Sequence, residues 1–168
     1  LGNAYADVGE PHKAIEYHEQ ALVISREIGD RRAEGQDLGS LGNGYRELDE
    51  PRKAIEYYEQ ALEISREIGD RRVEGSHLGN LGSAYANLGE PRKAIKYYKQ
   101  ALDIAREIGD RRGEGIHLYN LAIQLMQVEE RARALDLARA SLRIHEEIED
   151  PWTEKVRAAL ARWEQGGT

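Results

Sequence analysis

The chain repeats itself at a spacing of about 40 residues, and this period constrains the fold more than any other feature of the sequence. Residues 41–80 and 81–120 agree at about 28 of 40 aligned positions, and weaker copies begin at Leu1 and Leu121. A fixed period in this range is typical of arrays in which each repeat packs only against its neighbours. We therefore expect four stacked units rather than one irregular core.

Within the third unit, the apolar residues between Pro91 and Ile108 recur at the three-and-four spacing of one helix face. Pro91 suits the first helical position, and Gly109 suits the left-handed cap that follows a helix. Asp110 can then accept hydrogen bonds from the first free N–H groups of a helix at 111–128. Each unit is thus predicted to be a pair of helices, with LGxxY in helix A and KAIxYxxQAL in helix B.

The predicted fold class is all-α, an α-solenoid of stacked antiparallel helical hairpins with a C-terminal capping helix. The predicted segments are a truncated first repeat at 1–29, a second at 30–69, a third at 70–109, a degenerate fourth at 110–149 and the capping helix at 150–165. Because the chain opens at Leu1 in the middle of a repeat, we expect it to be a fragment of a longer protein. Trp152 and Trp163 are expected to cover the edge of the last hairpin.

Composition narrows the range of partners. The net charge of -7 disfavours a phosphate-binding surface, so nucleic acid is not expected. No apolar run approaches the ~20 residues of a membrane-spanning helix, so no membrane contact is expected. The chain has no cysteine, which is compatible with the cytoplasm and leaves no thiolate for catalysis or metal binding.

Neither a metal site nor a catalytic site is predicted. His77 and His117 fall one repeat apart on successive hairpins, while His12 and His18 lack the i, i+4 spacing of a helical zinc pair. No nucleophile has a base and an orienting residue at a recognisable spacing. We therefore predict that the segment is not an enzyme and needs no cofactor.

One set of residues stands at the spacing of the tetratricopeptide repeat signature: Leu81, Gly82, Tyr85, Ala94, Tyr98 and Ala101. The same set recurs 40 residues earlier, and the chain resembles this family over most of its length. It departs from the usual unit of about 34 residues by its length, by the missing early Trp and by the replacement of the closing Pro. The long variant is similar to the repeats of Pins-type spindle-orientation adaptors and to bacterial arrays of STAND-type ATPases and CHAT-type proteases. The resemblance implies a right-handed superhelix with a concave groove lined by the A helices.

The resemblance also implies where a ligand would bind. Asparagines commonly clamp the ligand backbone at the places held here by Asn3, Asn43, Asn80 and Asn120. An amide both donates and accepts hydrogen bonds, which suits an extended peptide of any sequence. Alternatively, these amides link adjacent helices. Residues expected on or near the same surface are Arg46, Ser83, Asn87 and Tyr119, with Arg46 a candidate partner for a carboxylate.

Helix A is unusually rich in glycine. Gly42 is expected to let helix B approach through Ala54, and the same is expected one repeat later. Gly39 and its counterpart Gly79 are expected toward the concave surface, where a missing side chain could admit a ligand backbone. For these two glycines, packing between helices is the alternative.

An arginine pair follows each helix-opening aspartate, beginning at Arg31, Arg71 and Arg111. The helix dipole makes this an unfavourable place for cations. We expect the pairs to serve packing between units, and an acidic partner is the alternative.

The predicted function is a protein–protein interaction scaffold that binds a peptide or protein segment in the groove. One alternative is the sensor or regulatory arm of a larger STAND-type NTPase or CHAT-type protease. Another is a self-associating array, because a truncated first repeat is expected to leave the faces of Tyr5, Ala14 and Ile15 partly uncovered at the N-terminal edge.

Overall fold

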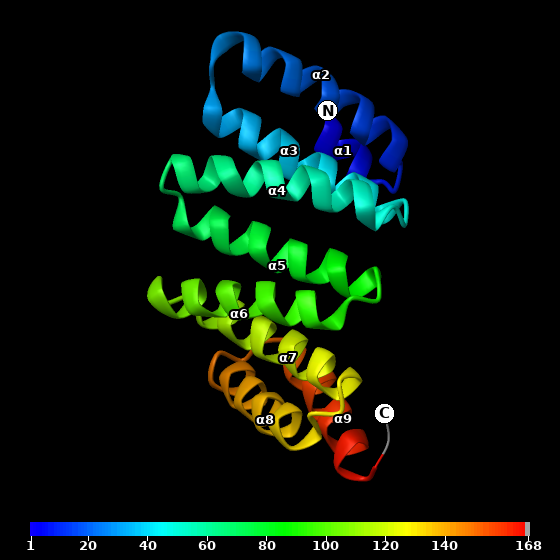
Figure 1. Ribbon diagram of the computed structural model, residues 1–168, viewed down its shortest axis with the longest axis vertical. Coiled ribbons are helices and arrows are strands. Elements are labelled where there is room, and N and C mark those ends of the chain that lie inside the picture. The colour runs from blue at the N-terminus through cyan, green and yellow to red at the C-terminus, as the bar shows by residue number, and fades with distance from the viewer. Residues whose placement is uncertain (167–168) are drawn as a thin grey trace. The chain divides into compact units, whose positions relative to one another are not determined.

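The computed structural model describes residues 1–166, and all regular secondary structure within them is α-helical. Consecutive helices run antiparallel within each part of the chain (Figure 1). Their bounds are α1 (Gly2–Asp7), α2 (Pro11–Ile28), α3 (Arg31–Glu47), α4 (Pro51–Glu67), α5 (Arg71–Asn87), α6 (Pro91–Glu107), α7 (Arg111–Gln127), α8 (Arg131–Glu147) and α9 (Trp152–Glu164). The all-α class of helical hairpins is therefore confirmed.

The helices group into two compact units. The first, Leu1–Leu88, holds α1 to α5, and the second begins at Gly89 and holds α6 to α9. The boundary lies inside the segment 70–109 that the sequence assigns to the third repeat. The two helices of that repeat consequently belong to different units, and each unit is described by itself below.

The turns follow the predicted rules. Pro91 is the first residue of α6, and Gly109 after that helix adopts a positive φ of 70°. The Asp110 carboxylate accepts a hydrogen bond of 2.9 Å from the backbone N–H of Gly113, and the same bond recurs at the start of α3 and α5. The aspartate satisfies a donor that its helix leaves free, and the Gly109 N–H donates to the carbonyl oxygen of Arg106 at the end of the preceding helix, so these residues set where the helices begin and end.

In the first unit, Gly42 marks a close approach between α3 and α4. A Cβ at this position would lie 2.5 Å from the ring of Tyr58. The close approach agrees with the sequence-based expectation: Ala54 of α4 is fully buried, and the side chain nearest to Gly42 is the Tyr58 ring, which the sequence did not indicate. A tyrosine ring fits here because a glycine leaves a notch of about its thickness in the facing helix.

The N-terminal edge of the first unit differs from the expectation. Ala14 and Ile15 are only 2% and 7% exposed, because α1 and α3 pack against α2. Tyr5 stacks on Tyr17 with ring centroids 5.2 Å apart. The expected uncovered faces of Ala14 and Ile15 are therefore covered, whereas Tyr5 stays partly exposed. The large apolar side chains that α2 does expose lie nearer its C-terminal end: Val23, Ile24 and Ile28.

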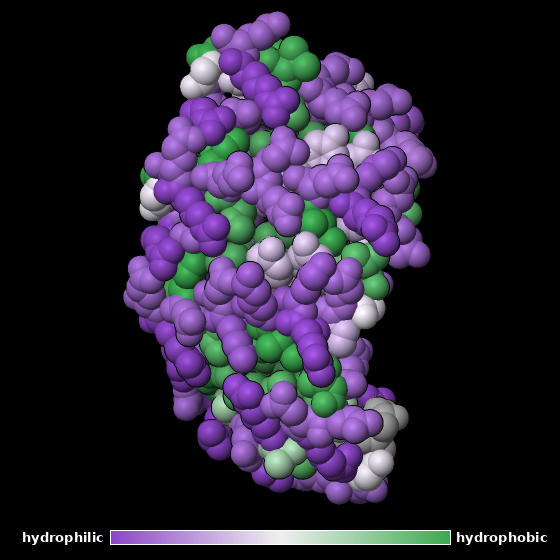
Figure 2. Space-filling view, in the orientation of Figure 1, coloured by the Kyte–Doolittle hydropathy of each residue, from purple (hydrophilic) through white to green (hydrophobic). Residues whose placement is uncertain are grey.

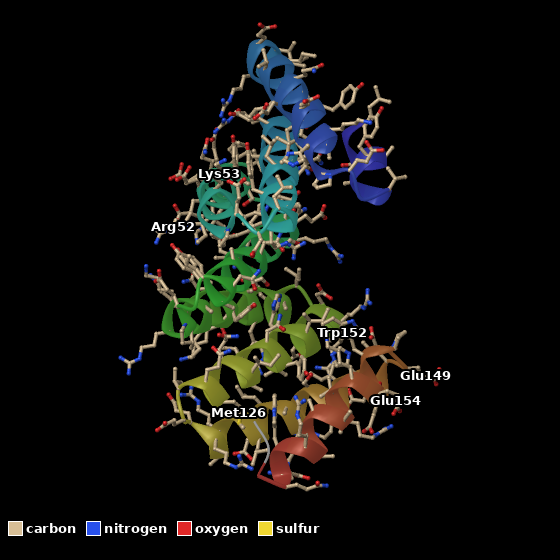
Figure 3. All side chains as sticks on the ribbon, turned by 90° about the vertical axis from the view of Figure 1, so that its right-hand side faces the viewer. Arg52, Lys53, Met126, Glu149, Trp152 and Glu154 are labelled. Carbon is tan, nitrogen blue, oxygen red and sulfur yellow. The ribbon has the colours of Figure 1, made fainter. Side chains whose placement is uncertain are left out.

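In the second unit, α9 closes the core as predicted. Trp163 is buried, and Trp152 at the start of α9 packs beside the same core (Figure 3). Arg131 of α8 donates a hydrogen bond to the carbonyl oxygen of Trp163, which ties the end of α9 to the start of α8. Arg157 and Arg162 on the opposite side of α9 are exposed.

Arginine–glutamate pairs join successive helices along one edge. Arg26 of α2 donates to the Glu34 carboxylate at 2.9 Å, and Arg31 bridges Glu34 and Glu67 of α4. Arg32 reaches Asp70, the cap of α5, at 2.6 Å. The arginine pair of α3 thus serves packing between repeats, as expected.

This network also explains why a buried glutamate follows each arginine pair. Burial alone would raise the pKa of Glu34, but hydrogen bonds from Arg26 and Arg31 outweigh it and hold that pKa below its ordinary value. Glu74 and Glu114 make the same contacts in α5 and α7.

The surface is largely polar. Hydrophilic side chains dominate the face shown in Figure 2, and hydrophobic ones appear in small groups between them. Among the described helices, none has both the length and the apolar character that crossing a membrane would need.

Candidate functional site

Two neighbouring hollows lie in the first unit, over the helices that carry the LGxxY letters. The larger has a volume of about 340 Å³ and the smaller about 230 Å³. The larger is lined by Asn3 of α1, by Gln36, Gly39, Ser40 and Asn43 of α3, and by Ser76, His77 and Asn80 of α5. The structure therefore brings together three of the four predicted asparagines.

The two hollows share part of their lining, which makes them one groove. Asn3, Ser40 and Asn43 line both of them. Gln36, Ser40 and Asn43 follow one another at four and three residues along α3, so helix geometry places them in one stripe. We call the two hollows together the amide groove.

Asn43 has a second contact that the sequence did not settle. The hydroxyl of Tyr58 donates a hydrogen bond of 2.7 Å to its Oδ1. Tyr58 is fully buried, whereas Asn43 is exposed and lines both hollows. Asn43 thus links α3 to α4 and also borders the groove, so the two interpretations of this amide do not exclude each other.

The protonation state of Tyr58 follows from its surroundings. Burial raises the pKa of its hydroxyl to about 12, with a smaller opposing effect of the Arg46 charge. The hydroxyl therefore keeps its proton at neutral pH and remains a hydrogen-bond donor.

His77 forms part of the lining of the larger hollow. A Cβ on Gly39 would lie 2.7 Å from Cε1 of its ring, so Gly39 packs against His77 in the structure. Both ring nitrogens are buried without a hydrogen-bond partner, and burial lowers the pKa of His77, with Asp70 opposing. The sequence indicated the contact between Gly39 and His77 only through the recurring glycine, because His77 belongs to the next repeat.

Charged side chains enter only the smaller hollow. Arg46 lines it as the sequence predicted, but Asp7 and Glu47 line it too. The lining of the larger hollow is neutral apart from the imidazole of His77. The groove is therefore suited to a polar backbone rather than to a strongly charged ligand.

The remaining predicted residues lie elsewhere. Ser83 donates to the carbonyl oxygen of Gly79, four residues back in α5. Gly79 is buried, and Asn87, the last residue of α5, is exposed. The lining of the two hollows includes none of the three. Asn120 is partly exposed on α7, in the second unit.

Tyr119 departs from the expectation of a ligand-facing residue. It is only 6% exposed, and its ring centroid lies 6.1 Å from those of both Trp152 and Trp163. Its place in the structure is the core beneath α9. The tryptophans that bury it stand more than 30 residues later in the chain, so no local pattern revealed this contact.

A serine, an aspartate and a histidine also meet beside the smaller hollow, whose lining includes the histidine, but not as a nucleophilic triad. Ser25 Oγ donates to Asp37 Oδ2 at 3.2 Å, and His18 Nδ1 lies 3.6 Å from Asp37 Oδ1. The aspartate is therefore the central member. Nucleophilic activation needs the histidine to be the direct partner of the serine, so this cluster is a partly buried polar network.

Antiparallel helix pairs that pack in sequence order, with polar side chains of alternate helices lining a hollow, define a repeat array of the protein-interaction class. The sequence family agrees with this class. The chain belongs to the tetratricopeptide repeat family, whose model matches residues 1–67 and 73–147. A search of curated proteins found no match.

Solved structures share the fold. The apo form of RapI is 17% identical, with a TM-score of 0.92 over 98% of this chain. A STAND protein with a tetratricopeptide repeat sensor from Pyrococcus horikoshii is 27% identical, with a TM-score of 0.81 over 89% of this chain. A Rap protein in complex with competence and sporulation factor is 16% identical, with a TM-score of 0.80 over 98% of this chain. This chain spans 61%, 23% and 47% of those three chains, respectively.

Proposed function

We propose that the first unit binds an extended peptide or protein segment along the amide groove. The observation that carries this proposal is that three successive A helices each place an asparagine, Asn3, Asn43 and Asn80, on the lining of the larger hollow. Amide side chains spaced along a groove match the regular donors and acceptors of an extended backbone.

The character of the lining supports a backbone ligand. Serine and glutamine side chains stand between the asparagines, and they too can donate or accept without demanding charge. Arg46 in the smaller hollow adds one cation, which the two carboxylates of Asp7 and Glu47 outnumber. A ligand held mainly through its backbone would therefore tolerate several side-chain sequences.

In this role the chain binds and does not catalyse. An aspartyl phosphate phosphatase from Bacillus subtilis has the same fold, but at 14% identity the likeness extends to the fold alone. Among the described residues, the groove histidine His18 contacts the carboxylate of Asp37, so the aspartate rather than a serine is the partner of the histidine.

The test uses a random 12-residue peptide library displayed on phage and selected against the whole chain. Affinities of the selected peptides are then measured by isothermal titration calorimetry. Asn43→Ala and Asn80→Ala should each weaken binding about fivefold or more, since each removes hydrogen bonds worth about 1 kcal/mol. Gln20→Ala, an exposed amide on α2, is the matched control and should bind like the wild type. Selected peptides that bind both asparagine variants unchanged would refute the proposal.

A second candidate is a sensor or regulatory arm of a larger NTPase. The observation that favours it is the 27% identity to the STAND protein with a tetratricopeptide repeat sensor, of which this chain covers 23%. The amide groove would then be the sensing surface. Joining the chain to its native flanking sequence and measuring nucleotide hydrolysis with and without a selected peptide distinguishes the two roles.

A further inference from the structure

The contact between Tyr58 and Asn43 determines which end of one groove amide faces a ligand. The tyrosine hydroxyl donates to Asn43 Oδ1 at 2.7 Å, so the amide oxygen already has a partner. The amide nitrogen carries two further N–H donors. Since Asn43 is exposed and lines both hollows, these donors are the part of the amide left for a ligand.

The Tyr58 ring is held tightly enough to fix this arrangement. It is fully buried and lies in the notch at Gly42, where even a methyl group would come within 2.5 Å of the ring. The ring therefore has no room to move toward α3. A buried hydroxyl without an acceptor is costly, so turning the amide over would leave the hydroxyl proton unpaired.

We infer that Tyr58 is a positioning residue that holds the amide nitrogen of Asn43 toward the groove, and that the ligand presents a backbone carbonyl oxygen to this nitrogen. This inference rests on the proposed function, because it concerns the ligand of the amide groove. It also assigns a direction to the hydrogen bond: the amide nitrogen donates and the ligand accepts. An amide without a fixed orientation could do either.

Neighbouring side chains favour a carbonyl over a carboxylate. Arg46 lies three residues after Asn43 on α3, and its guanidinium group can only donate hydrogen bonds. Asp7 and Glu47 line the same smaller hollow and would repel a full negative charge. A carbonyl oxygen accepts hydrogen bonds without carrying that charge.

The experiment is a double-mutant cycle on the whole chain, with a peptide selected from the random 12-residue library as the probe. Asn43→Ala should weaken its affinity about tenfold, and Tyr58→Phe about three- to tenfold. In the Asn43→Ala background, Tyr58→Phe should cause no further loss, because Tyr58 acts only through Asn43. Tyr17→Phe, which removes the hydroxyl of a tyrosine stacked on Tyr5 and absent from the lining of both hollows, is the control and should not change the affinity.

Asn43→Asp tests the direction of the hydrogen bond. A carboxylate can still accept from Tyr58 but cannot donate to a ligand, so binding should fall at least as far as in Asn43→Ala. Full affinity of Asn43→Asp, or an equal loss from Tyr58→Phe in both backgrounds, would overturn the inference. Either result can occur while Asn80→Ala still weakens binding. In that case the proposed function stands, and only the inference about Tyr58 fails. If no variant of Asn43 or Asn80 changes the affinity for the peptide, both the proposed function and the inference about Tyr58 fail.

Discussion

Gly42→Ala should destabilise the first unit, although alanine is the better helix former. In an unstrained helix the change would stabilise the folded state by about 1 kcal/mol. Here the new Cβ would lie 2.5 Å from Cε1 and 2.6 Å from Cδ1 of Tyr58, closer than any real contact. Both atoms belong to a rigid ring that is fully buried, so the ring or α4 must shift.

The expected net effect combines three contributions. Overpacking of this kind costs about 1–3 kcal/mol. Moving the ring also weakens the hydrogen bond to Asn43, which contributes about 1 kcal/mol. After subtracting the gain in helix propensity, we expect unfolding free energy to fall by about 1–3 kcal/mol.

Urea unfolding followed by far-ultraviolet circular dichroism measures this change. Gly35→Ala in the same helix is the matched control, because the nearest atom to its Cβ is a methyl carbon of Ile64 at 3.0 Å. This contact is longer than the 2.5 Å contact at Gly42 and involves one methyl group of a buried side chain rather than a ring, so the control should lose less stability than Gly42→Ala. A Gly42→Ala variant as stable as the wild type would refute the close approach of Tyr58.

Three further results are expected. Asp49 adopts a positive φ of 57° in a turn where the next repeat has Gly89, so Asp49→Gly should raise the unfolding free energy by about 0.5–1 kcal/mol, measured by the same urea titration. Burial lowers the pKa of His117 to about 4, so the unfolded state binds more protons below pH 6.5, and stability should fall on acidification to pH 5 by on the order of 1–2 kcal/mol; His117→Gln should flatten this dependence. If the chain self-associates, the exposed apolar end of α2 is the expected contact; sedimentation across a concentration series should then show a larger species that Ile24→Lys removes, and a monomer at every concentration would exclude it.

Local chemistry made the helices predictable. Pro91, Gly109 and Asp110 act within one or two turns of the chain, so their effect on helix ends does not depend on distant residues. The 40-residue period then gave the order of helices, because each hairpin can bury its apolar stripe only against its neighbours. The three asparagines of the amide groove followed from the same period together with the family resemblance.

Contacts between different repeats were not predictable in this way. The Tyr58 ring lies in the notch at Gly42, and His77 lies against Gly39 on the lining of the larger hollow. Tyr119 is a core residue because Trp152 and Trp163 close over it.

The sequence by itself determined the helical hairpins, their ends and the residues that recur on each helix face. Only the tertiary structure decided which of those residues meet, since side chains from separate helices compete for the same space and the sequence does not record their rotamers. Asn43 shows the difference. Its place on helix A follows from the repeat, but the end of its amide that faces the groove depends on the hydroxyl of Tyr58, fifteen residues away on the next helix.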